Sequence, residues 1–264
     1  MERMNGKKIR MNRITQNGRA VIIPMDHGTT IGPVNGIENM NDTVCCIDTG
    51  GATAVVLHKG IIRSLQETPK CGLIMHLSVS TKFAANPEKK VIVGSVKEAS
   101  RLGADAVSVH LNIGGNEAEP QMIKDMGKIA EDCDEMQIPL LVMAYPRGDK
   151  VKDSMDPENV AMVARAAAEM GADIVKTNYT GDSESFKKVT STCPVPVVIA
   201  GGPKCNTDRE VLEMVKGAMQ GGAAGISLGR NAFQHDSPEN IVKALRAIIV
   251  DNNSVDEALK VMSQ

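Results

Sequence analysis

One stretch decides the fold of this chain: Met170-Gly171-Ala172-Asp173-Ile174-Val175-Lys176. A helical pattern ends at its glycine, and a short apolar strand follows. The same order recurs at residues 50–57, 102–109 and 221–228. Glycine readily adopts the left-handed conformation that closes a helix, and continuously apolar strands are typical of buried parallel sheets. The recurrence therefore predicts a series of helices that each lead into a parallel strand.

Four more apolar runs, at residues 21–25, 73–77, 139–145 and 195–200, bring the number of predicted strands to eight. Eight parallel strands that alternate with helices predict a closed (β/α)8 TIM barrel, and a doubly wound open sheet is the alternative. The chain has 264 residues, which is the usual size of one such barrel. We expect a single domain over residues 1–264, with a short N-terminal extension over about residues 1–18.

The composition argues against several classes of function. The net charge is −2, aromatic residues make up 2% of the chain and Trp is absent, so we expect no nucleic-acid partner. No apolar run approaches the roughly 18 residues of a membrane span, and the polar N-terminus lacks the apolar core of a signal peptide. The 6 cysteines form no C-x-x-C pair. We therefore expect a cytoplasmic protein with reduced thiols and no membrane partner.

The lysine at the end of the opening stretch, Lys176, is the first candidate for chemistry. Active sites of barrels of this type lie at the carboxyl ends of the strands. An amine that loses solvation there can become uncharged and act as the nucleophile of a Schiff-base enzyme. The alternatives are a lysine that reaches solvent from the edge of the core, and one that pairs with Asp173.

Other candidates follow predicted strands at the same edge. Tyr145 precedes a rigid turn and is a candidate proton donor, with a half-buried structural tyrosine as the alternative. Asp26 is a candidate general base, or else a cap of its own loop. Glycine segments follow the seventh and eighth strands, where barrels commonly bind phosphate, although a glycine pair alone usually marks a turn. These segments are Gly201-Gly202, with Lys204 nearby, and Gly229-Arg230.

Three histidines, His58, His76 and His110, lie near the ends of the second, third and fourth predicted strands. Neutral imidazoles bind zinc, so a metal-dependent aldolase or hydrolase is one interpretation. No H-x-H or H-E-x-x-H pattern supports it, and we expect hydrogen-bonded strand ends and no metal site. The connections at residues 59–70 and 77–93 are short of a full helix, so each is a candidate lid over the barrel mouth.

A set of short motifs recurs together along the chain. They are Pro24-Met25-Asp26-His27-Gly28, Leu57-His58-Lys59-Gly60, Tyr145-Pro146-Arg147-Gly148, Asp173-Ile174-Val175-Lys176-Thr177, Tyr179-Thr180-Gly181-Asp182, Ala200-Gly201-Gly202-Pro203-Lys204 and Gly229-Arg230-Asn231. On these motifs, nearly the whole chain resembles the archaeal class I aldolase family, which includes fructose-1,6-bisphosphate aldolases and 2-amino-3,7-dideoxy-D-threo-hept-6-ulosonate synthases. Residues 175–182, the pair Pro203-Lys204 and residues 233–236 are most similar to the synthase branch.

The resemblance implies a (β/α)8 barrel that works without a metal or a cofactor. It implies that Lys176 is the Schiff-base lysine, Tyr145 the proton donor and Asp26 the proton acceptor. The implied substrate-binding positions are Asp26, His27, Gly28, Thr29, Thr30, Tyr145, Pro146, Arg147, Lys176, Thr177, Asn178, Gly201, Gly202, Gly229 and Arg230. Asn178 departs from the family pattern, which has a small serine there, and we expect it to alter one substrate contact.

For the synthase branch, the resemblance implies the transfer of a three-carbon unit. The donor is the phosphosugar 1-deoxy-D-threo-hexo-2,5-diulose 6-phosphate and the acceptor is L-aspartate 4-semialdehyde, in the archaeal route to 3-dehydroquinate and aromatic amino acids. A fructose-1,6-bisphosphate aldolase on the same scaffold is the first alternative, and a non-catalytic phosphosugar-binding protein is another. Members of the family look decameric, so the resemblance also implies a homo-oligomer.

Overall fold

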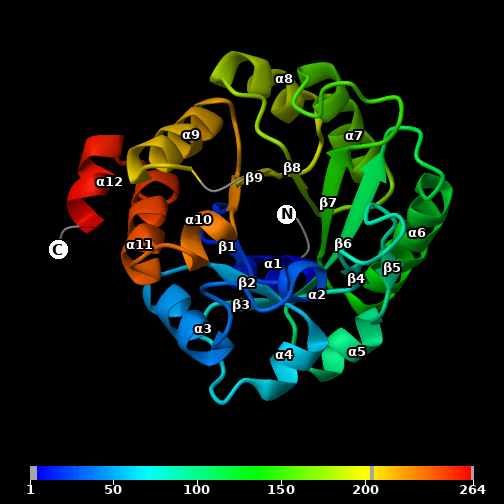
Figure 1. The fold of residues 1–264 in the computed structure, drawn as a ribbon, viewed down its shortest axis with the longest axis horizontal. Helices are drawn as coiled ribbons and strands as arrows, with labels where there is room; N and C mark the ends of the chain where they lie inside the picture. Colours follow the sequence, from blue (N-terminus) through cyan, green and yellow to red (C-terminus); the bar gives the residue numbers. More distant parts are fainter. Residues whose placement is uncertain (1–4, 203–204, 263–264) are drawn as a thin grey trace.

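The computed structural model describes residues 5–202 and 205–262. Within these residues, eight parallel strands close into a barrel in the order β1-β10-β9-β8-β7-β6-β3-β2 (Figure 1). The strands are β1 (Ala20–Pro24), β2 (Ala54–Leu57), β3 (Gly72–His76), β6 (Ala106–Ile113), β7 (Leu140–Pro146), β8 (Ile174–Thr177), β9 (Val197–Ala200) and β10 (Gly225–Ser227). The closed order confirms the predicted (β/α)8 barrel, and the open sheet was the wrong alternative.

Helices surround the barrel on all sides in Figure 1. The helices that follow barrel strands are α3 (Met40–Thr49), α4 (Lys59–Ser64), α5 (Val96–Arg101), α6 (Glu119–Met136), α7 (Pro157–Glu169), α8 (Ser183–Thr192), α9 (Asp208–Gln220) and α11 (Pro238–Ile249). Four more helices lie outside this pattern in the described chain: α1 (Gly6–Ile14), α2 (Gly28–Ile31), α10 (Arg230–Phe233) and α12 (Val255–Met262). No helix of the described residues is both long enough and apolar enough to cross a membrane.

Local sequence explains where these helices begin and end. The Asp156 side chain accepts a hydrogen bond from the Asn159 backbone N–H at the start of α7, and Thr207 with Glu210 forms a reciprocal capping box at the start of α9. The glycines of the four recurring segments have φ angles of 86° at residue 51, 78° at 103, 104° at 171 and 88° at 222. Each therefore closes its helix in the left-handed conformation, as predicted.

The two faces of the barrel strands pack against different cores. Alternate side chains along a strand point to opposite faces. One set, which includes Ile22, Val56 and Ile74, fills the inside of the barrel. The other set, which includes Val55 and Val142, packs beneath the surrounding helices. Both faces of each strand are buried, which explains why the strands are apolar along their whole length.

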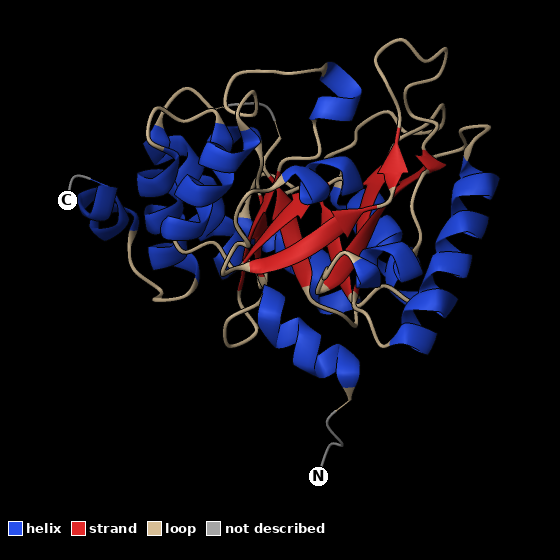
Figure 2. Ribbon diagram, turned by 90° about the horizontal axis from the view of Figure 1, so that it is seen from below, coloured by secondary structure: helices blue, strands red, loops and turns tan. Residues whose placement is uncertain are grey.

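The N-terminal segment closes the amino-terminal end of the barrel. Figure 2 shows α1 beneath the strands, at the end away from the arrowheads. Ile14 at the end of this helix is fully buried and joins the cluster of side chains inside the barrel. The Lys7 ammonium, near the start of α1, lies 2.9 Å from an Asp173 carboxylate oxygen and 2.5 Å from one of Asp134. Because α1 covers the amino-terminal end of the barrel, only the carboxyl-terminal end is left open for a functional site.

The two connections that were candidate lids differ in structure. Residues 77–93 include a two-stranded antiparallel hairpin, β4 (Ser78–Val79) and β5 (Val91–Ile92), whose strands pair Ser78 with Ile92. Residues 59–70 begin with the short helix α4, whose Lys59 and Arg63 both form ion pairs with Glu98 of α5. Only the first of these connections brings side chains to the cavity described below.

Candidate active site

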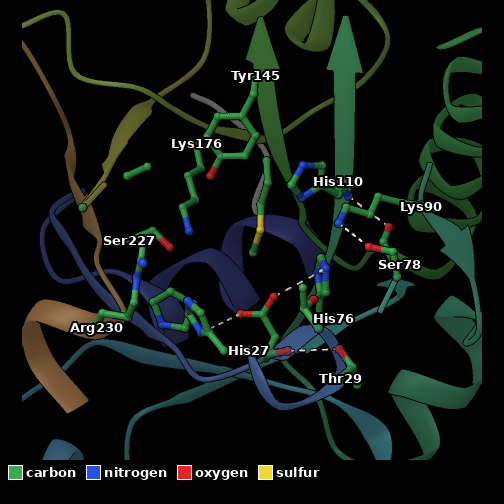
Figure 3. Close-up of a pocket in the computed structure, with 18 of the residues that line it drawn as sticks. His27, Thr29, His76, Ser78, Lys90, His110, Tyr145, Lys176, Ser227 and Arg230 are labelled. Atoms are coloured by element: carbon green, nitrogen blue, oxygen red, sulfur yellow. Dashed lines mark hydrogen bonds and ion pairs between the residues drawn. The ribbon is translucent and has the colours of Figure 1, made fainter. Parts of the chain in front are cut away.

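A cavity of about 360 Å³ lies at the carboxyl ends of the barrel strands. Figure 3 shows the side chains that line it. They come from every strand of the described barrel or from the residues that follow it: Pro24, Asp26, His27, Thr29, Thr30, Ile31, His58, His76, Ser78, Ser80, Lys90, His110, Met143, Tyr145, Arg147, Lys176, Asn178, Ala200, Gly201, Gly202, Ser227, Gly229 and Arg230. The cavity is therefore built by the barrel as a whole.

Strand alternation brings the polar residues of the site together. On β7 the inward positions are Leu141, Met143 and Tyr145, and the β7–β8 register places Met143 beside Lys176. Inward side chains are apolar near the amino-terminal ends of the strands, and polar ones replace them at the carboxyl ends. The packed apolar side chains inside the barrel thus lie directly beneath the polar groups and fix their positions.

Lys176 reaches this cavity from β8 and is only 7% exposed to solvent. Asp173, the alternative partner, instead accepts a hydrogen bond from the Leu140 backbone N–H and binds Lys7 at the other end of the barrel. Figure 3 shows the amine of Lys176 and the hydroxyl of Tyr145 pointing into the same space. The arrangement places an amine and a phenol around one position for a substrate carbonyl.

Tyr145 is buried between two polar neighbours. Its ring lies 5.1 Å from the His110 ring, and the Arg147 guanidinium carbon is 4.6 Å from its centroid. These contacts hold the ring in place and leave its hydroxyl directed into the cavity. The geometry suits a proton donor at a developing or departing oxygen.

Asp26 lies on the floor of the cavity between two imidazoles. Its carboxylate oxygens are 3.7 Å from His76 Nε2 and 3.9 Å from His27 Nδ1. Burial acts to raise the pKa of Asp26, but His76, His27 and Lys176 act in the opposite direction and hold that pKa below its ordinary value. Asp26 is therefore an ionised carboxylate at neutral pH, which is the protonation state that a proton acceptor needs.

The histidines form a hydrogen-bonded layer beneath this carboxylate. His76 Nδ1 lies 2.8 Å from Ser108 Oγ, and His58 is 3.1 Å from the Thr29 hydroxyl and 3.2 Å from the His76 carbonyl oxygen. Burial lowers the pKa of His76 to about 4, and it also lowers the pKa of His58 and His110. Within the described residues, no group of three or more His, Cys, Asp or Glu side chains is arranged to hold a metal ion.

The opposite wall of the cavity is made of backbone from the ends of β9 and β10. A Cβ added at Gly229 would lie 2.7 Å from the Pro24 carbonyl oxygen and 2.6 Å from His27, so a side chain there would clash with the wall. Arg230 donates a hydrogen bond of 2.7 Å to the Gly202 carbonyl oxygen. The buried Ser227 hydroxyl also lines the cavity, and it has no hydrogen-bond partner among residues 5–202 and 205–262. The Arg230 guanidinium, the Ser227 hydroxyl and the backbone N–H groups of this wall are hydrogen-bond donors that could bind an oxyanion such as a phosphate.

The structure places most of the predicted site residues at the cavity. Gly28, Pro146 and Thr177 do not line it. Thr177 and Pro146 follow inward-facing residues directly, so strand alternation turns them away from the cavity. Asn178 lines the cavity and donates a hydrogen bond to the Ser154 carbonyl oxygen. Lys204 lies outside the described residues.

Sequence reasoning missed several residues of the cavity. Ser227 has a signal in the sequence, because it is an inward position at the end of its strand, two residues before Gly229. Ser78, Ser80 and Lys90 have no such signal, because the pairing of a hairpin places them there. His58, His76 and His110 were recognised as strand ends, but the approach of His76 and His58 to Asp26 was not foreseen.

Known proteins match nearly the whole chain. The model of the DeoC/LacD family of aldolases matches residues 20–235. A protein of Archaeoglobus fulgidus named 2-amino-3,7-dideoxy-D-threo-hept-6-ulosonate synthase 1 is 44% identical over 259 residues, which cover 97% of this chain and 96% of the relative. A Streptomyces griseus protein named 2-amino-4,5-dihydroxy-6-oxo-7-(phosphonooxy)heptanoate synthase is 40% identical over 247 residues, which cover 92% and 90%.

A solved structure shares the fold along most of both chains. It is an archaeal fructose-1,6-bisphosphate aldolase whose catalytic lysine is covalently bound to a carbinolamine intermediate of the substrate. The TM-score is 0.86 at 32% identity, with 93% of this chain and 99% of the other covered. These matches confirm the resemblance to class I aldolases. The chain belongs to the DeoC/LacD family of aldolases.

Proposed function

We propose that the protein is a Schiff-base synthase that moves a three-carbon unit from 1-deoxy-D-threo-hexo-2,5-diulose 6-phosphate to L-aspartate 4-semialdehyde. The observation that carries this proposal is the Lys176 amine, which enters the same cavity as the Tyr145 phenol and the Asp26 carboxylate. The name of the Archaeoglobus fulgidus relative supports this pair of substrates, and the names of both reported relatives describe synthases of seven-carbon amino acids. The product is 2-amino-3,7-dideoxy-D-threo-hept-6-ulosonate.

The first step forms the imine. The Lys176 amine attacks the C2 ketone of the donor and gives a carbinolamine. Tyr145 donates a proton to the carbinolamine oxygen, which leaves as water. The resulting iminium withdraws electrons from the neighbouring carbon. The barrel wall around Gly202, Gly229 and Arg230 holds the donor's phosphate while this occurs.

The second step breaks the C3–C4 bond of the donor. Asp26 accepts the proton of the C4 hydroxyl, the bonding electron pair moves to the iminium, and hydroxypyruvaldehyde phosphate leaves. The enamine that remains on Lys176 attacks the aldehyde carbon of L-aspartate semialdehyde, whose oxygen receives the proton from Asp26. Hydrolysis of the new iminium then frees the product and the amine. No metal or cofactor takes part in these steps.

The proposal also covers the partners of the enzyme, its compartment and its oligomeric state. Its partners are a small phosphosugar and L-aspartate semialdehyde, and it acts in the cytoplasm in the archaeal route to 3-dehydroquinate and aromatic amino acids. The family resemblance favours a homo-oligomer, and specifically a decamer. Chelation should leave the activity unchanged, whereas loss on chelation and recovery with zinc would establish the metal-dependent alternative.

A second candidate is a fructose-1,6-bisphosphate aldolase. The fold match to such an aldolase, at a TM-score of 0.86, favours it. The same lysine, tyrosine and aspartate would serve both reactions. The test is a side-by-side measurement of kcat/KM for the two substrate sets on the purified protein. The proposal predicts a higher value for the diulose phosphate with aspartate semialdehyde, and a higher value for fructose bisphosphate cleavage would overturn it.

A further inference from the structure

The cavity wall at the ends of β9 and β10 has a polar group that the protein itself leaves unsatisfied. The Ser227 hydroxyl is fully buried, lines the cavity and has no hydrogen-bond partner in the described part of the chain. Figure 3 shows Ser227 and Arg230 on the same side of the site. A buried hydroxyl without a partner is unfavourable, so a ligand that pairs with it gains affinity.

Arg230 makes this wall suited to an anion. Its guanidinium donates a hydrogen bond of 2.7 Å to the Gly202 carbonyl oxygen. Among the residues that the structure describes, it forms no ion pair with a carboxylate. Its other N–H groups can therefore bind the oxygens of a ligand, and a guanidinium binds phosphate and carboxylate equally well in geometry. The wall thus suits either anion.

The cations on the opposite side of the cavity already have contacts of their own. The Lys90 ammonium donates a hydrogen bond of 2.5 Å to Ser80 Oγ. The Arg147 guanidinium carbon lies 4.6 Å from the centroid of the Tyr145 ring and helps to hold that ring in place. No contact of this kind engages Ser227 within the described chain. An anionic ligand therefore gains more at the wall of Ser227 and Arg230.

The chemistry of the transfer brings two anions to one position. The fragment that leaves and the acceptor that replaces it bond in turn to the same enamine carbon, which Lys176 holds in place. In the leaving fragment, two further carbons separate the reacting carbon from the phosphate group. In L-aspartate semialdehyde, two further carbons separate the aldehyde carbon from the carboxylate. The two anions therefore extend nearly the same distance from the enamine, and the phosphate must leave before the carboxylate can bind.

We propose that Arg230 and Ser227 form one anion site that is used twice, first for the phosphate of the donor and then for the carboxylate of the acceptor. The inference rests on the proposed function, because it follows one wall of the cavity through both halves of the transfer. Arg230 and Ser227 are then specificity-determining residues, which favour an acceptor with a carboxylate over an equally long neutral aldehyde.

The first test compares acceptors in Arg230→Met and Ser227→Ala. Succinate semialdehyde is L-aspartate semialdehyde without its amino group, and butanal is the neutral aldehyde of the same length. Because the acceptor meets the enzyme only after the phosphorylated fragment has left, its kcat/KM excludes the binding of the donor. We expect the ratio of kcat/KM for succinate semialdehyde to that for butanal to fall about tenfold to hundredfold in Arg230→Met and about tenfold in Ser227→Ala.

Lys90→Met is the comparison variant, because it removes a cation from the opposite side of the same cavity. It should keep the wild-type ratio. A fall in Lys90→Met without one in Arg230→Met would place the carboxylate across the cavity and overturn the proposal. A wild-type ratio in all three variants would also overturn it.

Inorganic phosphate tests the sharing of the site in the wild-type protein. When the donor is saturating, phosphate can bind the site only after the phosphorylated fragment has left, and there it competes with the acceptor. It should therefore raise KM for L-aspartate semialdehyde and leave kcat unchanged. A lower kcat under these conditions would mean that phosphate and the acceptor bind at the same time, and the shared site would be wrong.

The failure of the proposed function can be told apart from the failure of this inference. If the wild-type protein forms no imine, the proposed function fails, and 4-hydroxybutanoate, the unreactive alcohol of succinate semialdehyde, then tests the site alone. In an NMR titration, inorganic phosphate should displace it, and its affinity should fall at least tenfold in Arg230→Met. Binding of 4-hydroxybutanoate and phosphate at the same time would refute the shared site.

Discussion

Replacing His76 by Asn should make the protein less sensitive to acid. Burial lowers the pKa of His76 in the folded state to about 4, whereas an unfolded histidine has a pKa of about 6.5. Between these values the unfolded chain binds more protons than the folded one, so stability is complete above pH 6.5 and is lost as the pH falls. At pH 5, this one side chain should lower the free energy of unfolding by about 2 kcal/mol relative to pH 7.

The assay is urea-induced unfolding, followed by circular dichroism at pH 7 and pH 5 for the wild-type protein and for His76→Asn. The difference between the two pH values is compared, so the pH-independent cost of losing the contact with Ser108 cancels. His27, His58 and His110 add to the loss in both proteins, because burial lowers their pKa values too. Asp26, whose folded pKa is also low, affects stability only below about pH 4. An equal loss in both proteins would refute the buried, neutral state of His76.

Three further predictions test other parts of the account. Tyr145→Phe should lower kcat about 10²- to 10⁴-fold, as expected for a lost proton donor, while a titration shows that phosphate binding persists; unchanged turnover would remove Tyr145 from the mechanism. Arg230→Met should raise KM for the phosphorylated donor about tenfold to hundredfold with little effect on kcat, and an unchanged KM would mean that the anion site is misplaced. Ile14→Ala should lower the free energy of unfolding by about 2–5 kcal/mol, because the side chain is fully buried at the base of the barrel. A denaturation midpoint equal to that of the wild type would show that α1 does not close the barrel.

Much of the fold could be predicted because the helix-ending glycines and the apolar strands are recognisable within short segments of the sequence. Gly171 ends a helix within its own segment, and the apolar run after it has few options other than a buried strand. The position of Lys176 near the end of that run then specifies which end of the barrel it occupies. The same reasoning located Asp26, Tyr145 and Gly229, since the carboxyl ends of all parallel strands meet at one edge.

The features that escaped prediction depend on contacts between distant segments. Lys90 faces the cavity only because the hairpin pairs Val79 with Val91, and no local pattern specifies that register. The approach of His76 to Asp26 joins the ends of two strands that are not neighbours in the barrel order. The sequence did not predict that the N-terminal extension closes the base of the barrel. The burial of Ile14 depends on the whole barrel, and no local pattern around this residue indicates it.

The central claim is that the amine of Lys176 condenses with the ketone of the substrate. The most direct measurement is peptide mass spectrometry after borohydride reduction of the protein in the presence of each candidate ketose. The account predicts a stable adduct on Lys176 with 1-deoxy-D-threo-hexo-2,5-diulose 6-phosphate, and none in Lys176→Ala. An active protein that yields no adduct, or an adduct on a different lysine, would contradict it.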